Sequence, residues 1–173
     1  ADSHSPTGGG LGALTIGVGS TDAAIAMATG KSWFRVPQTI RVEITGDLPK
    51  GCYSKDVVLT VAKEIGSDGA NYRVIEYTGP TVCSFNVPSR LTLTNMSAEM
   101  GAKAAIVAPD NNTKIYLKEN DRLIEFDEIT SDPEAHFEKE LRFDISNLKP
   151  MIACPPDIDN DVPVDQVEPE KIL

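Results

Sequence analysis

The chain has 173 residues and a formal net charge of −10 at pH 7, a sign that repels phosphate backbones and excludes nucleic acid as an expected partner. Hydrophobic residues make up 40% and charged residues 24%, which is typical of a globular domain and too apolar for a disordered chain. Because no run of about 18 apolar residues occurs, we expect no membrane-spanning segment and no membrane partner.

The first region, residues 8–30, is rich in glycine and alanine. It predicts two short, close-packed helices over residues 9–18 and 21–29, with Ser20 as a helix N-cap and Gly30 as the stop. Side chains this small allow two backbones to approach closely, which is useful beside a ligand.

Strands and helices alternate after Pro37. Apolar residues at every second position from Thr39 to Thr45 predict a strand, because side chains alternate between the two faces of a sheet. A helix is expected to begin at Ser54 and to end at Gly66. The other elements predicted in this part of the chain are strands at 73–78 and 104–108 and a helix at 88–100.

The last third of the chain carries shorter signals. Ser131-Asp132-Pro133 predicts a helix near 133–138, and strands are predicted at 141–145 and 151–154. Residues 155–173 are rich in proline and acidic residues and predict an extended surface linker rather than a packed element. This order of elements predicts an α/β fold, a layered sheet with flanking helices and mixed or mostly parallel strands.

The three cysteines, Cys52, Cys83 and Cys154, form no C-x-x-C pair. Their spacing therefore predicts neither a zinc site nor an iron–sulfur site within this chain, and so few cysteines make a disulfide framework improbable. We expect three buried or half-buried thiols, no metal ligands and a reducing compartment, cytoplasmic or, in a eukaryote, mitochondrial.

Two other motif matches are loose. Residues 157–168 place acidic side chains at several positions of a calcium-loop template, but Val162 and Pro163 occupy positions that the loop needs for glycine and for a flexible ligand. Residues 8–13 fit a loose dinucleotide-loop pattern, but no apolar strand precedes them. Nucleotide binding is therefore the weakest of the functions that we consider.

Asp2-Ser3-His4 brings a carboxylate, a hydroxyl and an imidazole within three residues, just before a glycine-rich turn. An Asp–His pair can tune a proton donor or acceptor near neutral pH, and a following helix start offers backbone N–H groups to an anion. By itself, the same motif also fits a polar surface turn that caps a helix.

Four further segments give this motif its context. The motif lies within residues 2–12 and is followed by residues 16–23, Tyr53-Ser54-Lys55-Asp56-Val57, residues 95–102 and residues 157–164. In this order, the five segments resemble the D-S-H, G-x-G, S-x-K-D-V, N-M-x-x-E-x-G-A and D-N-x-x-P-V segments of the aconitase family. That family includes aconitase, homoaconitase and the large subunit of 3-isopropylmalate dehydratase. The likeness covers nearly the whole chain.

The resemblance implies a hydro-lyase that reversibly dehydrates and rehydrates a hydroxy-polycarboxylate with a [4Fe–4S] cluster. It implies that Asp2, His4 and Glu99 are catalytic and that Ser3 and Asn95 bind substrate. In this family His4 would hydrogen-bond the hydroxyl or water at the open iron, and Asp2 would help to protonate the departing hydroxyl. Glu99 follows Asn95 by four positions, so on the predicted helix both would lie on one face.

The family's two cysteine motifs for the cluster are missing from this sequence, so the resemblance implies that cysteines outside this chain ligate the [4Fe–4S] cluster. It also implies an internal piece: residues 1–30 would end a first domain, residues 31–154 would form an α/β domain, and residues 155–173 would lead to a further domain. We expect this chain alone to be inactive, with the remaining domains or a small subunit carrying the swivelling domain as its partners.

Two questions stay open at this point. The chain could instead be a stand-alone, non-catalytic α/β binding or interaction domain that reuses the framework. The substrate within the family, whether of isopropylmalate (leucine biosynthesis), homocitrate or citrate type, is also undecided, because the residues that would distinguish these acids lie mostly outside this chain.

Overall fold

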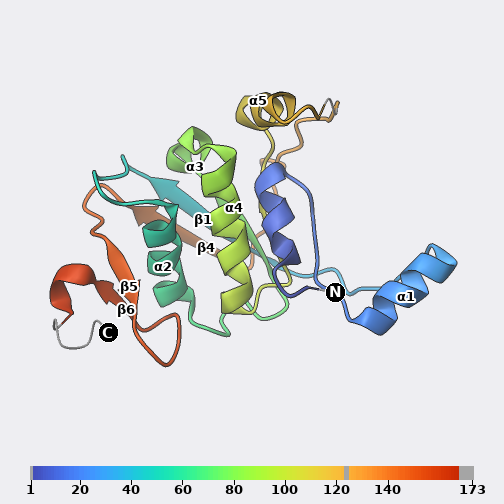
Figure 1. Ribbon diagram of the computed structural model, residues 1–173, viewed down its shortest axis with the longest axis horizontal. Helices are drawn as coiled ribbons and strands as arrows, with labels where there is room; N and C mark the ends of the chain where they lie inside the picture. The colour runs from blue at the N-terminus through green and yellow to red at the C-terminus, as the bar shows by residue number, and fades with distance from the viewer. Residues whose placement is uncertain (1, 123–124, 168–173) are drawn as a thin grey trace.

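The computed structural model describes residues 2–122 and 125–167 and is built around a four-stranded parallel sheet (Figure 1). The strands run in the order β3-β2-β1-β4, and every neighbouring pair is parallel. The strands are β1 (Thr39–Thr45), β2 (Val74–Thr78), β3 (Ala104–Val107) and β4 (Lys139–Asp144). The predicted α/β class is confirmed.

Helices cover one face of this sheet (Figure 1). The alternation in β1 places Ile40, Val42 and Ile44 in the core, where valines of a helix starting at Ser54 pack against them. The covering elements are α2 (Ser54–Ile65), α4 (Val87–Met96) and the 3₁₀ helix η1 (Ser5–Leu11). The short helix α3 (Pro80–Ser84) leads from β2 into α4.

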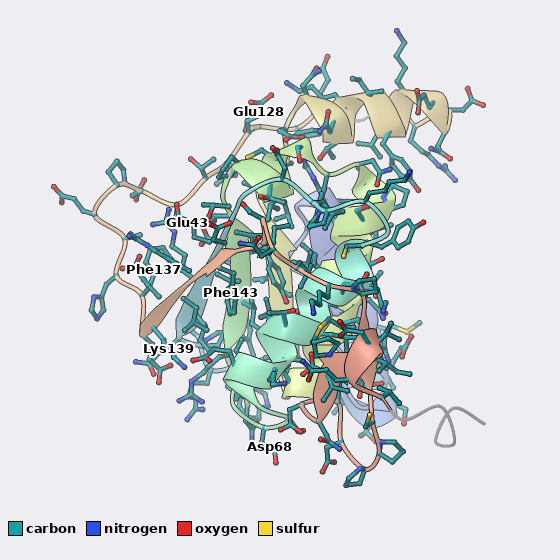
Figure 2. The ribbon with its side chains drawn as sticks, turned by 90° about the vertical axis from the view of Figure 1, so that its left-hand side faces the viewer. Glu43, Asp68, Glu128, Phe137, Lys139 and Phe143 are labelled. Carbon is teal, nitrogen blue, oxygen red and sulfur yellow. The ribbon has the colours of Figure 1, made fainter. Side chains whose placement is uncertain are left out.

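The second face of the sheet is polar. Glu43 of β1 pairs with Arg142 of β4 at 3.0 Å, and Arg41 lies 4.0 Å from Glu140. Figure 2 shows Glu43 and Phe137 on this side of the sheet, away from α2. Parallel sheets are usually apolar on both faces, so the charged side chains distinguish this face from the helix-covered one.

A β-hairpin packs beside α2. Strands β5 (Met151–Ala153) and β6 (Asp161–Pro163) pair antiparallel, and the 3₁₀ helix η3 (Val164–Gln166) follows. Asp56 of α2 accepts a hydrogen bond from the Met151 backbone N–H at 2.7 Å, and Lys63 donates to the Asp161 carbonyl at 2.6 Å. The expectation that no packed element follows residue 154 was therefore wrong for 161–166, because the partners that fix the hairpin come from α2 and not from its own sequence.

Three other expectations differ from the structure. No α-helix forms over 9–18: the glycines take the tighter η1 turn, and regular structure resumes only at α1 (Ser20–Thr29). The helix expected near 133–138 is a turn within an irregular segment. Helix α5 (Asn111–Glu119), capped by the Asp110 side chain, was not anticipated. Across the described residues, no helix is long and apolar enough to cross a membrane.

Candidate active site

The candidate site residues meet at the amino end of the sheet. Helix α4 leads into β3 through a second 3₁₀ turn, η2 (Ser97–Met100), so its carboxyl end lies where the parallel strands begin. Asn95 and Glu99 lie there, and the turn from Asp2 to His4 enters η1 at the same end. Two segments more than 85 positions apart in sequence thus meet: their hydrogen bonds span 88 and 95 positions.

Glycines seat η1 against its neighbours. A Cβ added at Gly9 would lie 1.7 Å from the Ala105 carbonyl oxygen of β3, and one at Gly10 would lie 2.7 Å from the Leu91 backbone nitrogen of α4. Only glycine permits backbones to approach this closely. The glycine run therefore serves packing against α4 and β3, and this packing fixes the position of the turn that precedes η1.

His4 stands at the centre of the site. Its Nε2 lies 2.9 Å from Glu99 Oε1, and its Nδ1 lies 3.1 Å from the Ser3 hydroxyl. With Glu99 ionised, the neutral ring is assigned as donating from Nε2 to the carboxylate and accepting at Nδ1 from Ser3. The His4 backbone N–H donates to Asp2 Oδ1 at 3.0 Å, which orients the turn. About 39% of the His4 side chain and 44% of Glu99 are exposed, so a ligand can reach both.

Thr7 links Asn95 to this turn. Its hydroxyl lies 2.9 Å from Asn95 Oδ1 and 2.6 Å from the His4 carbonyl oxygen, while Thr94 donates to the Thr7 carbonyl at 2.9 Å. Neither threonine was predicted as a site residue from the sequence. The signal in the sequence is the spacing of Thr7, three residues after His4, which lets a hydroxyl bond back to the backbone.

A buried hydrogen-bonded pair anchors the start of η2, two residues before Glu99. The Ser97 hydroxyl lies 2.9 Å from the Tyr77 hydroxyl and also donates to the Leu93 carbonyl at 3.0 Å. Burial raises the pKa of Tyr77, so its phenol stays neutral and can hydrogen-bond Ser97. The helix expected over 88–100 ends at Met96 and continues as η2, and the carboxylate of Glu99 still reaches His4.

A cavity of about 390 Å³ opens beside Asp2 and Ser3. Lys103 lines it, donates to the Gly17 carbonyl at 2.9 Å and lies 5.7 Å from the centre of the Tyr72 ring. Lys103 thus brings a positive charge to the mouth of a site otherwise bordered by carboxylates, where it can attract an anionic ligand. The sequence analysis did not single out Lys103, although it directly follows the block that contains Asn95 and Glu99.

The cysteines of the described segments do not fit an iron–sulfur cluster. Cys52 is buried and its thiol faces the Leu148 carbonyl, and Cys154, which follows β5, is half-buried. The expectation of burial was wrong for Cys83, which is exposed because it lies at the end of the short helix α3. Within residues 2–122 and 125–167, no three His, Cys, Asp or Glu side chains form a group that could hold a metal ion. Among the described residues, the side chains near His4 therefore do not provide the thiolate ligands that an iron–sulfur cluster needs.

Comparison with known proteins gives consistent matches. A sequence model of the aconitase family (aconitate hydratase) matches residues 1–172. The chain is 53% identical over 168 residues to 3-isopropylmalate dehydratase large subunit 1 of Methanopyrus kandleri, covering 97% of this chain and 40% of that protein. It is 45% identical over 172 residues to the protein of that name in Thermotoga maritima, covering 99% of this chain and 41% of that protein. It is 45% identical over 168 residues to a probable methanogen homoaconitase large subunit of Methanothermobacter thermautotrophicus, covering 97% and 39%. The chain thus spans about 40% of the length of these relatives.

Proposed function

Because this chain belongs to the aconitase family, we propose that the protein containing it is a hydro-lyase that isomerises a hydroxy-polycarboxylate by dehydration and rehydration. The observation that carries the proposal is the hydrogen bond between His4 and Glu99, with Ser3 on the other ring nitrogen. It gives a polarised imidazole, reachable from solvent, at a position where the family resemblance expects proton chemistry.

Dehydration needs a proton donor, because hydroxide is a poor leaving group. We propose that His4 and Glu99 supply the proton that reaches the departing hydroxyl oxygen. This oxygen leaves as water when the C–O bond breaks. The proton from the neighbouring carbon goes to a base that we assign to the rest of the protein. Rehydration reverses both transfers, and the hydroxyl returns to the adjacent carbon.

The other site residues orient substrate and catalyst. Asp2 fixes the His4 backbone in this structure, and we propose that its carboxylate also shares in protonating the hydroxyl. Ser3 and Asn95 offer a hydroxyl and an amide for substrate oxygens. Lys103 adds a cation suited to a substrate carboxylate, in the cavity that Asp2 and Ser3 also line.

The names of the relatives favour isopropylmalate as the substrate, with a homocitrate-type acid second and citrate third. These relatives are named as large subunits, so we propose a separate small subunit as the partner, which completes the site. We propose that the family's [4Fe–4S] cluster is ligated by cysteines beyond this chain, and we derive no step through it.

The test uses the full-length protein with its small subunit, assayed on 2- and 3-isopropylmalate, homocitrate and citrate. We expect turnover of an isopropylmalate, and a fall in kcat of about 10²–10⁴ in both His4→Gln and Glu99→Gln. His136→Gln is the matched control, because the other histidine of this chain is exposed and lies outside the site. Full activity of the His4 variant, or no turnover of any of these acids by the intact protein, would refute the proposal.

A further inference from the structure

A second cavity, of about 320 Å³, lies at the opposite end of the strands from His4. Gly79 and Ala108, the residues that follow the carboxyl ends of β2 and β3, both line it. In parallel sheets, ligands are usually bound outside the carboxyl ends of the strands. The candidate active site lies at the amino ends of the strands, so the proposed hydro-lyase reaction does not use this cavity.

Two polar atoms of residues in the wall of this cavity have no hydrogen-bond partner among the described residues. Arg41 lies beside Glu76 in the sheet register, and Thr78 follows on the same face. Arg41 Nε and Thr78 Oγ1 are both shielded from solvent, and neither has a hydrogen-bond partner in the part of the chain that the structure describes. An unsatisfied buried donor is costly, so both groups favour a ligand that brings an acceptor, and a carboxylate suits a guanidinium and a hydroxyl together.

Negative charge faces the same space. Glu76 accepts a hydrogen bond from the Ser131 hydroxyl at 2.6 Å, and Asp132 also lines the cavity. Arg90, a further wall residue, offers no free charge, because Asp110 holds its guanidinium at 2.7 and 2.9 Å. Arg41 differs from Arg90, because its Nη1 comes no closer than 4.0 Å to Glu140, beyond hydrogen-bonding distance, and its side chain is 39% exposed. The cavity therefore presents both a cation and carboxylates to its contents, which suits a molecule that carries both charges.

The remaining wall is apolar and includes Val82, Val107 and Pro133. We propose that this cavity binds an α-amino acid zwitterion with an aliphatic side chain, such as L-leucine. The ligand carboxylate contacts Arg41 and Thr78, its ammonium group faces Glu76 and Asp132, and its side chain packs on the apolar wall. This site is independent of the proposed hydro-lyase activity, because it shares no residue with the His4 site.

Cys83 provides the readout, because it is exposed and lines the cavity. The full-length protein is alkylated with iodoacetamide at increasing concentrations of L-leucine, and the tryptic peptide 74–90, which contains no other cysteine, is followed by mass spectrometry. We expect L-leucine to slow alkylation of Cys83 in a saturable way and to raise the Tm. We expect 4-methylpentanoate and 3-methylbutylamine, which each carry one of the two charges, to protect Cys83 more weakly.

Two variants locate the site. Arg41→Met and Thr78→Val should each weaken protection by L-leucine by about tenfold, the effect of losing a hydrogen bond to a charged group. Thr78→Val keeps the side-chain shape and removes an unpaired buried hydroxyl, so its fold is preserved and its Tm does not fall. Arg142→Met is the matched control: Arg142 lies on the same face, pairs with Glu43 and is outside the cavity wall.

Three results would overturn the proposal. L-leucine could leave the alkylation rate of Cys83 unchanged. It could protect Cys83 equally in the Arg41 and Thr78 variants. Or 4-methylpentanoate could protect as well as L-leucine does, which would make this a simple carboxylate site.

Discussion

Thr7 connects the two halves of the candidate active site, since its hydroxyl lies within hydrogen-bonding distance of both the His4 carbonyl and the Asn95 amide oxygen. In the full-length enzyme we expect Thr7→Val to lower kcat by about fivefold, because losing a hydrogen bond of this kind costs about 1 kcal/mol and loosens His4. Thr7→Ser should restore activity, whereas Thr92→Val, at a half-buried position of α4 whose hydroxyl donates to the Pro88 carbonyl, should leave kcat unchanged. Equal activity of Thr7→Val and the native enzyme would show that this link is dispensable.

Asp161 predicts a pH-dependent stability. Both of its carboxylate oxygens are buried without a partner among the described residues, and burial raises the pKa of this carboxyl. The stabilising contribution of the neutral form is complete below the unfolded-state pKa and is lost as the pH rises through the folded-state pKa. Asp161 is therefore destabilising at pH 7.

We expect Asp161→Asn to raise the Tm at pH 7 by about 2–4 °C, the shift that corresponds to about 1 kcal/mol in a chain of this size. The gain should shrink as the pH falls through the range in which aspartate titrates. Thermal melts of both proteins between pH 3 and pH 7 would test this, because the ordinary aspartate pKa of about 4 lies within that range. Asp157→Asn, at an exposed position, serves as the control. A gain that does not depend on pH would contradict the explanation by charge.

Among the elements, η1 depends most on a single residue type. A methyl group at Gly9 would collide with the Ala105 carbonyl at 1.7 Å, so either β3 or η1 must shift. We expect Gly9→Ala to lower the free energy of unfolding by about 1–3 kcal/mol, and to lower activity further because the His4 turn moves with η1. Gly19→Ala is the control, since Gly19 has a φ of −64° and a Cβ there comes no closer than 3.3 Å to another atom. Denaturant unfolding of both variants makes the comparison.

The elements also show what the sequence can predict. Strand β1 was anticipated because period-two alternation reflects one buried face, and α2 because its start and stop residues are local. η1 was misjudged because its shape depends on Ala105 and Leu91, which are far away in sequence. The residues of the site were grouped by a family resemblance. Their links through Thr7 could not be anticipated, because a hydrogen bond across 88 positions leaves no local pattern.

On the scale of the whole chain, the molecule has a one-sided core and an exposed arm. Helix α1 buries none of its side chains and extends away from the sheet (Figure 1), and 88% of Met27 is exposed. We expect Met27→Gln to change the free energy of unfolding of the 173-residue chain by no more than about 0.5 kcal/mol. Leu93→Ala, at a fully buried position of α4, should cost about 2–5 kcal/mol. A large loss in the Met27 variant would mean that the arm contributes to the core.

The packing of η1 against β3 also determines when the candidate site can form during synthesis. Gly9 packs against Ala105, so the turn that contains His4 has nowhere to dock until α4 and β3 have left the ribosome. At about 5–20 residues per second, the ninety-odd intervening residues take roughly 5–20 s to translate. Throughout this interval His4 is without Glu99. The His4 turn is thus made well before the elements that hold it, and a nascent chain that has not yet released α4 and β3 has no competent His4 site.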